Sequence, residues 1–117
     1  MGNFKELNVW KNSKDLAVEI YRLTDQGRFC HDYGLRDQIR RSSVSIPSNI
    51  AEGDDLESDK QSIKYFYLAR GSLAELRTQL LISMEIEYIS KDKYDELEKR
   101  CEKISAMLIG LIRHRSK

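Results

Sequence analysis

The sequence predicts an all-α protein, an antiparallel four-helix bundle in which successive helices run up and down. Two observations lead to this fold class. Apolar residues recur every three or four positions over most of the chain, which places them along one face of each helix. The chain has only one proline and six glycines, too few for a turn-rich β fold. Because the segments between the periodic stretches are short, residues 1–117 should form a single domain.

Residues 35–53 are the most unusual stretch of the chain and should form one helix. Pro47 lacks an N–H group and its ring clashes with the carbonyl of Ser43, which predicts a kink. The apolar stripe keeps its phase across the proline, so we expect one kinked helix rather than two. Gly53 would then form a left-handed C-terminal cap. The apolar face of this helix carries Leu35, Ile39, Ile46 and Ile50.

Three more helices are predicted, over about residues 9–24, 59–86 and 91–113. Their expected N-cap residues are Asn8, Ser58 and Ser90. The third helix contains Gly71, whose cost in helix propensity suggests a site of close contact between helices.

Composition and charge restrict the class of protein. Charged residues make up 33% of the chain and the formal net charge is +1, so nucleic-acid binding would need a local basic patch or an oligomer that concentrates charge. The chain has only two cysteines, Cys30 and Cys101, which are far apart and form no CxxC motif. Such cysteine usage fits a reducing compartment. The sequence shows no signal-peptide pattern and no apolar run long enough to cross a membrane. We therefore expect a cytoplasmic protein without membrane association.

The sequence does not contain a recognisable catalytic constellation. The serines of residues 42–48 have no histidine nearby to act as a base. Cys30, His31 and Asp32 are consecutive and cannot surround one metal ion without distant partners. His114 lies in the C-terminal tail. We expect no enzymatic activity, no cofactor and no metal site.

Five arginines are the candidates for contact with nucleic acid. A cluster in the second helix and a basic tail, which also holds His114 and Lys117, could bind phosphates. The same cluster could equally be a solvated face whose arginines pair with Asp37 or with the acidic connector at residues 54–59, and the sequence alone favours neither interpretation. The candidate residues are Arg36, Arg40, Arg41, Arg113 and Arg115.

A second group of polar residues lies where the second and third helices should meet. Asn49 and Glu52 are next to apolar positions near the end of the second helix, and Arg70 lies on the third. Glu52 could pair with Arg41 or with Arg70. We interpret Asn49, Glu52 and Arg70 as a structural polar network rather than a binding site.

Three segments together resemble the bacterial four-helix-bundle proteins encoded in intervening sequences of 23S ribosomal RNA genes. They are FKELNVWKNSKDLAVEIY at residues 4–21, QIRRSSVSIPSNIAEG at residues 38–53 and YLARGSLAELRTQLLIS at residues 67–83. The accessory variability proteins of diversity-generating retroelements look like the same fold. Ser42 and Ser43 stand where relatives often have alanine, and Arg77 stands where glutamate is common, which would strengthen a basic surface.

The resemblance implies a non-enzymatic protein that assembles as a homopentameric ring and associates with RNA or DNA. A ring would bring copies of the arginine cluster around one axis. A second interpretation stays open, in which the protein is an adaptor or scaffold that binds a protein partner without contacting nucleic acid.

Overall fold

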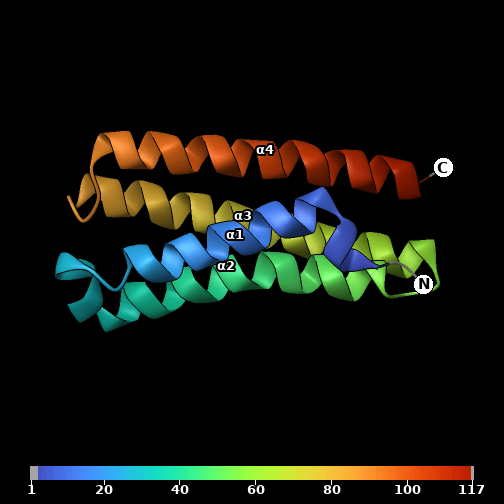
Figure 1. Ribbon diagram of the computed structural model, residues 1–117, viewed down its shortest axis with the longest axis horizontal. Coiled ribbons are helices and arrows are strands. Elements are labelled where there is room, and N and C mark those ends of the chain that lie inside the picture. Colours follow the sequence, from blue (N-terminus) through green and yellow to red (C-terminus); the bar gives the residue numbers. More distant parts are fainter. Residues whose placement is uncertain (1–2, 117) are drawn as a thin grey trace.

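The computed structural model describes residues 3–116 and contains four long helices (Figure 1). They are α1 (Asn8–Leu23), α2 (Tyr33–Asp54), α3 (Asp59–Glu85) and α4 (Lys91–Arg115), with short 3₁₀ helices at Phe4–Glu6 and Gly27–His31. The helices lie side by side along the long axis of a body measuring 44 × 22 × 20 Å. Consecutive helices run in opposite directions, so α1 and α3 run the same way. The expected all-α fold with four helices is confirmed.

Serine and aspartate side chains set the starts of three helices. Ser58 Oγ accepts a hydrogen bond from the Gln61 N–H, and Ser90 Oγ accepts one from the Lys93 N–H, as predicted. Asp32 caps α2 by accepting from the Leu35 N–H at 3.1 Å, so α2 begins two residues earlier than expected.

The expected cap at Asn8 is wrong. Asn8 is the first residue of α1, and Leu7 precedes it without a side-chain cap.

One apolar core runs through the bundle, with side chains from every long helix and from the 3₁₀ segment at Gly27–His31. The largest fully buried side chains are Leu16, Ile20, Phe29, Ile39, Ile46, Ile50, Phe66, Leu76, Leu80, Leu97, Ile104 and Leu108. Within residues 3–116, no helix is both long and apolar enough to cross a membrane.

Pro47 lies buried inside α2, and the helix continues past it to Asp54. The expectation of one helix rather than two is therefore confirmed. Ser43 lies one turn before the proline, and its hydroxyl donates to the Arg40 carbonyl oxygen at 2.8 Å. The buried Ile46 and Ile50 hold both sides of Pro47 against the core, which accounts for the continuity of the helix.

Two glycines have roles opposite to those expected. Gly53 is a buried residue inside α2 and not a left-handed cap. A Cβ atom there would lie 2.8 Å from the Phe66 ring and 3.0 Å from the Ser62 carbonyl oxygen, so Gly53 permits α2 to touch α3. Gly71 is exposed, and a Cβ atom there would meet nothing within 4 Å, so the expected close contact at Gly71 is wrong.

We expect Gly53→Ala to destabilise the protein, because the added methyl group would push α2 away from the backbone of α3. The expected loss is about 1–3 kcal/mol in the free energy of unfolding, measured by urea denaturation. Gly71→Ala is the matched control and should stabilise the protein by about 0.5–1 kcal/mol, since the site is open and helical. Equal effects of the two substitutions would contradict the close approach at Gly53.

Candidate nucleic-acid interface

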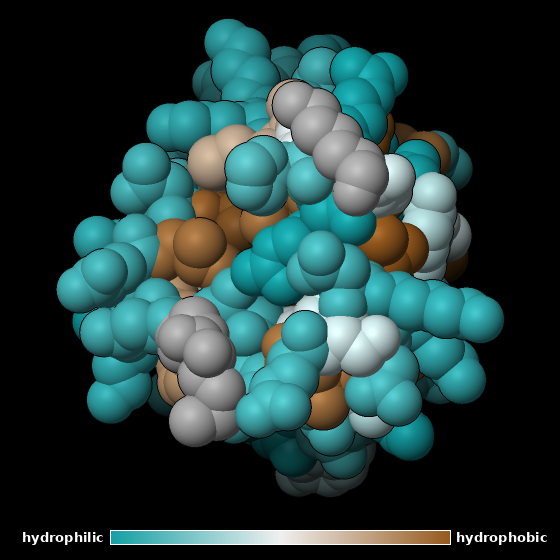
Figure 2. All heavy atoms as spheres, turned by 90° about the vertical axis from the view of Figure 1, so that its right-hand side faces the viewer, coloured by the Kyte–Doolittle hydropathy of each residue, from teal (hydrophilic) through white to brown (hydrophobic). Residues whose placement is uncertain are grey.

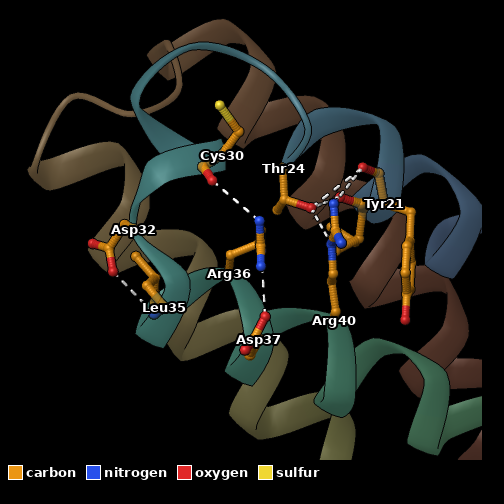
Figure 3. A network of polar contacts seen from close by, with 9 residues as sticks. Tyr21, Thr24, Cys30, Asp32, Leu35, Arg36, Asp37 and Arg40 are labelled. Carbon is orange, nitrogen blue, oxygen red and sulfur yellow. Dashed lines mark hydrogen bonds and ion pairs between the residues drawn. The ribbon is translucent and has the colours of Figure 1, made fainter.

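Arg36 lies at the start of α2 and is bound within the chain. Its Nη1 donates to the Cys30 carbonyl oxygen at 3.1 Å, and its Nε lies 3.3 Å from the Asp37 carboxylate (Figure 3). The guanidinium group also stacks over the exposed Tyr33 ring, 4.7 Å from its centroid. Arg36 therefore ties the 3₁₀ segment that precedes α2 to the helix.

Arg40 connects α2 to the end of α1. Its Nε donates to Thr24 Oγ1 at 2.8 Å, and its Nη2 donates to the Tyr21 carbonyl oxygen at 3.4 Å (Figure 3). Thr24 is fully buried, and its hydroxyl donates a hydrogen bond to the Ile20 carbonyl oxygen at 2.7 Å. The guanidinium group lies over the Tyr21 ring, 4.5 Å from its centroid. These contacts make Arg40 a structural residue in this chain.

Arg41 is exposed and borders a polar groove between α2 and α3 with a volume of about 550 Å³. Glu75 is the other charged residue of the groove. On its floor, Ser42 Oγ donates to Gln79 Oε1 at 2.5 Å, which joins the two helices. The groove is lined by Gln38, Arg41, Ser42, Ser45, Ser72, Glu75 and Gln79.

Arg115 belongs to the bundle rather than to a free basic tail. Its Nη2 lies 2.6 Å from Asp54 Oδ1, and Asp54 is only 3% exposed. Its Nη1 lies 3.7 Å from Asp59 Oδ1, and the guanidinium group lies over the Phe66 ring. This ion pair fixes the end of α4 at the α2–α3 connection, and α4 is correspondingly two residues longer than expected.

The five predicted arginines do not form one surface. Arg36 and Arg115 lie near opposite ends of α2, since Arg115 contacts Asp54. Arg41 and Arg113 are exposed and are free of ion pairs to any residue between 3 and 116. Lys117 lies outside the described residues. Figure 2 views the end of the bundle that carries the chain termini, where hydrophilic residues surround patches of apolar surface.

Arg77 does not extend a basic surface. Its Nε lies 2.6 Å from Glu98 Oε1, and the Tyr94 hydroxyl donates to the other oxygen of Glu98 at 2.9 Å. The hydrogen bond to Glu98 also raises the pKa of Tyr94. The expected contribution of Arg77 to a basic patch is therefore replaced by an ion pair between α3 and α4.

The structure does not join Asn49, Glu52 and Arg70. Asn49 Nδ2 donates to the carbonyl and hydroxyl oxygens of Ser45, at 2.8 and 3.2 Å. Glu52 and Arg70 are exposed, and neither has an ion pair with another described residue. The expected network is therefore wrong, because Asn49 bonds within its own helix while Glu52 and Arg70 are exposed to solvent.

The polar cluster near the α2–α3 connection consists of Asp54, Asp59 and Arg115 instead. Sequence reasoning missed it because Asp54 and Arg115 are 61 positions apart. The only local signal is an acidic residue directly after Gly53, which reads as part of an exposed connector.

Two further titratable groups with shifted pKa values, Asp32 and Cys101, lie at a helix cap and in the core. The hydrogen bond from the Leu35 N–H, followed by one from the Tyr88 hydroxyl at 2.8 Å, lowers the pKa of Asp32. Burial raises the pKa of the Cys101 thiol to about 12. No group of three or more potential metal ligands comes together within residues 3–116.

These features define an all-α bundle of four antiparallel helices. Arginine side chains connect its elements at both ends, Arg36 and Arg40 at one end and Arg115 at the other. The model of the 23S rRNA-intervening sequence protein family matches residues 5–110, so the chain belongs to this family. This confirms the resemblance found in the sequence.

A solved structure has the same fold. It is the crystal structure of a protein with unknown function from the S23 ribosomal protein family of Bacteroides thetaiotaomicron. The two chains are 26% identical and superpose with a TM-score of 0.82, over 89% of this chain and 97% of that chain. A search of curated proteins finds no match.

We expect Arg115→Met to destabilise the bundle by about 3 kcal/mol, because it leaves the Asp54 carboxylate buried without its partner. Arg113→Met removes the same charge from an exposed position of the same helix and should change stability by less than about 0.5 kcal/mol. Urea denaturation measures both. Similar values for the two variants would show that the Asp54–Arg115 pair does not hold α4 in place.

Proposed function

We propose that this protein is non-enzymatic, forms a homo-oligomer that is a pentameric ring, and associates with RNA. Membership of the 23S rRNA-intervening sequence protein family supports the link to RNA. The observation that carries the proposal is the amount of apolar surface left exposed by a single chain. The exposed large hydrophobic residues are Val18, Tyr21, Tyr33, Val44, Tyr67, Leu68, Leu81, Ile82 and Ile86.

Most of these residues gather on two surfaces, one between α1 and α2 and one along α3. Single exposed hydrophobic residues are ordinary, but grouped ones mark sites of association. Further copies of the same chain could cover both surfaces and remove their apolar side chains from water. Self-association therefore accounts for both surfaces at once.

Oligomerisation also bears on RNA binding. One chain has a formal net charge of +1 and two exposed, unpaired arginines among the five candidates, Arg41 and Arg113, so its attraction for phosphates would be weak. A ring repeats each arginine once per copy and raises the local positive potential. Binding by the ring should therefore be much stronger than binding by a single chain.

The adaptor function is the second candidate, in which the apolar surfaces bind a different protein. The observation that favours it is the internal use of Arg36, Arg40 and Arg115, which leaves fewer cations for phosphate contacts. Association through apolar surface would depend little on salt.

We expect the purified protein to be a multimer by light scattering and to bind single-stranded RNA with an affinity that falls steeply between about 50 and 200 mM salt. Arg41→Ala with Arg113→Ala should weaken binding and reduce the salt slope, since these arginines are free to contact phosphates. These variants avoid Arg40, whose removal would also break contacts between α1 and α2.

The matched control removes two exposed lysines of α4, Lys99→Gln with Lys103→Gln. Equal weakening by both pairs would contradict a specific role of Arg41 and Arg113 in phosphate contact. A multimer that binds neither RNA nor DNA at low salt would favour the adaptor function. A monomer would overturn the proposed assembly.

A further inference from the structure

Two surfaces on different sides of the bundle carry exposed apolar side chains, and each also holds one charged residue, Lys14 on one and Glu75 on the other. The first, called the hollow, is a depression of about 280 Å³ between α1 and α2, lined by Lys14, Ala17, Val18, Tyr21, Val44 and Pro47. The second, called the ridge, runs along the exposed side of α3 that borders α2 and consists of Leu68, Glu75, Ile82 and Ile86. We infer that the ridge of one copy packs into the hollow of the next. This inference rests on the self-association proposed above.

The hollow has an apolar floor that is open to solvent. Val18, Tyr21 and Val44 are 42%, 45% and 40% exposed. Pro47 lies beneath them in α2, and Lys14 at the N-terminal end of the depression is its only charged residue. The volume suits one or two aliphatic side chains from outside.

The ridge is a line of exposed side chains on α3. Leu68, Glu75 and Ile82 are seven residues apart, which keeps them on one line of α3. Leu68 and Ile82 are 50% and 45% exposed. Glu75 stands between them, exposed and without an ion pair to any residue in 3–116. Ile86 continues the line just after α3 ends.

A contact between two different surfaces is heterologous and produces either a closed ring or an open filament. A ring closes only when each copy is related to the next by rotation without translation along the axis. The two surfaces must therefore lie at the same level along the bundle and present helices in compatible directions.

The helix directions satisfy this condition. α1, which forms one wall of the hollow, and α3, which carries the ridge, run the same way (Figure 1). Rotation about an axis parallel to the helices preserves direction, so α3 of one copy would lie parallel to α1 of the next.

The hollow and the ridge also lie at the same level along the bundle axis, as judged from the α2 residues next to each. Tyr21 in the hollow contacts Arg40, and Ile82 on the ridge borders a depression together with Gln38. Arg40 and Gln38 are two residues apart in α2, a difference of about 3 Å along the axis. Ile82 of one copy therefore reaches the level of Tyr21 in the next by rotation alone.

The charged residues fall at a second common level. Lys14 lines the hollow together with Pro47, and Glu75 lines the polar groove together with Ser45. Pro47 and Ser45 are again two residues apart in α2. Within its own chain Lys14 pairs with the neighbouring, exposed Asp15, a contact of little energetic weight. Glu75 of the adjacent copy would give Lys14 a partner at the edge of the contact.

The two surfaces flank α2, so a ring built from them turns the outward side of α2 toward its axis. Arg41 and Asp37 are exposed on that side. Copies of Arg41 would then line the centre of the ring, next to copies of Asp37.

Disulfide trapping tests this contact in a Cys30→Ser background, which removes the partly exposed native thiol. Cys101 can stay, since it is buried and its raised pKa keeps it protonated. A chain carrying both Tyr21→Cys and Ile82→Cys, the two positions that lie at one level, should form, under mild oxidant, a ladder of covalent multimers that ends at the ring size. Each single variant alone should remain uncrosslinked, and a mixture of the two should give dimers only.

The matched control combines Tyr21→Cys with Lys99→Cys on α4 and should give no ladder. Crosslinking of Ile82→Cys with itself would overturn the inference in favour of a two-fold contact. A multimer by light scattering that gives no ladder would overturn the contact while leaving self-association intact. A monomer would overturn both.

Charge reversal tests the pairing of Lys14 with Glu75. Lys14→Glu or Glu75→Lys alone should weaken assembly by about tenfold, because each places like charges together at the contact. The double variant should restore assembly in sedimentation or light scattering. A double variant that is no better than the two single variants would overturn the pairing.

Discussion

The close packing of α2 against α3 is the constraint on which the rest of the bundle depends. At one end Gly53 brings the α2 backbone onto α3, and nearer the other end the Ser42 hydroxyl donates to Gln79. Between these points Ile46 and Ile50 are fully buried. α1 packs on α2 and α4 packs on α3, so the placement of both outer helices follows from the central pair. A displacement of α2 would change the core on both sides.

Sequence patterns predicted the helices better than the contacts between them. Helical periodicity and serine caps depend on residues a few positions apart, so the four helices and the caps at Ser58 and Ser90 could be found. The roles of Gly53 and Gly71 depend on which atoms lie across the interface, and a sequence does not contain that information. The polar cluster at the α2–α3 connection was missed for the same reason, because Asp54 and Arg115 are far apart in the sequence and meet only in the packed bundle.

Arginine serves two purposes in this chain. A guanidinium group has five donors and a flat face, so it can bind carbonyl oxygens and stack on a tyrosine at the same time. Arg36 and Arg40 do both, at the junction of α1, the 3₁₀ segment and α2. A count of arginines in the sequence therefore overstates the cationic surface. The charge available to a phosphate is set by the residues without internal partners, such as Arg41.

Arg40 terminates a helix to which it does not belong. The last carbonyl groups of any α-helix lack partners within the helix and carry partial negative charge. At the end of α1 a cation from α2 meets that charge, through the Tyr21 carbonyl oxygen and the Thr24 hydroxyl. A helix of 16 residues is barely stable in isolation. Because these contacts couple the two segments, we expect the last turns of α1 and the first half of α2 to open to solvent together, as one cooperative unit for hydrogen exchange.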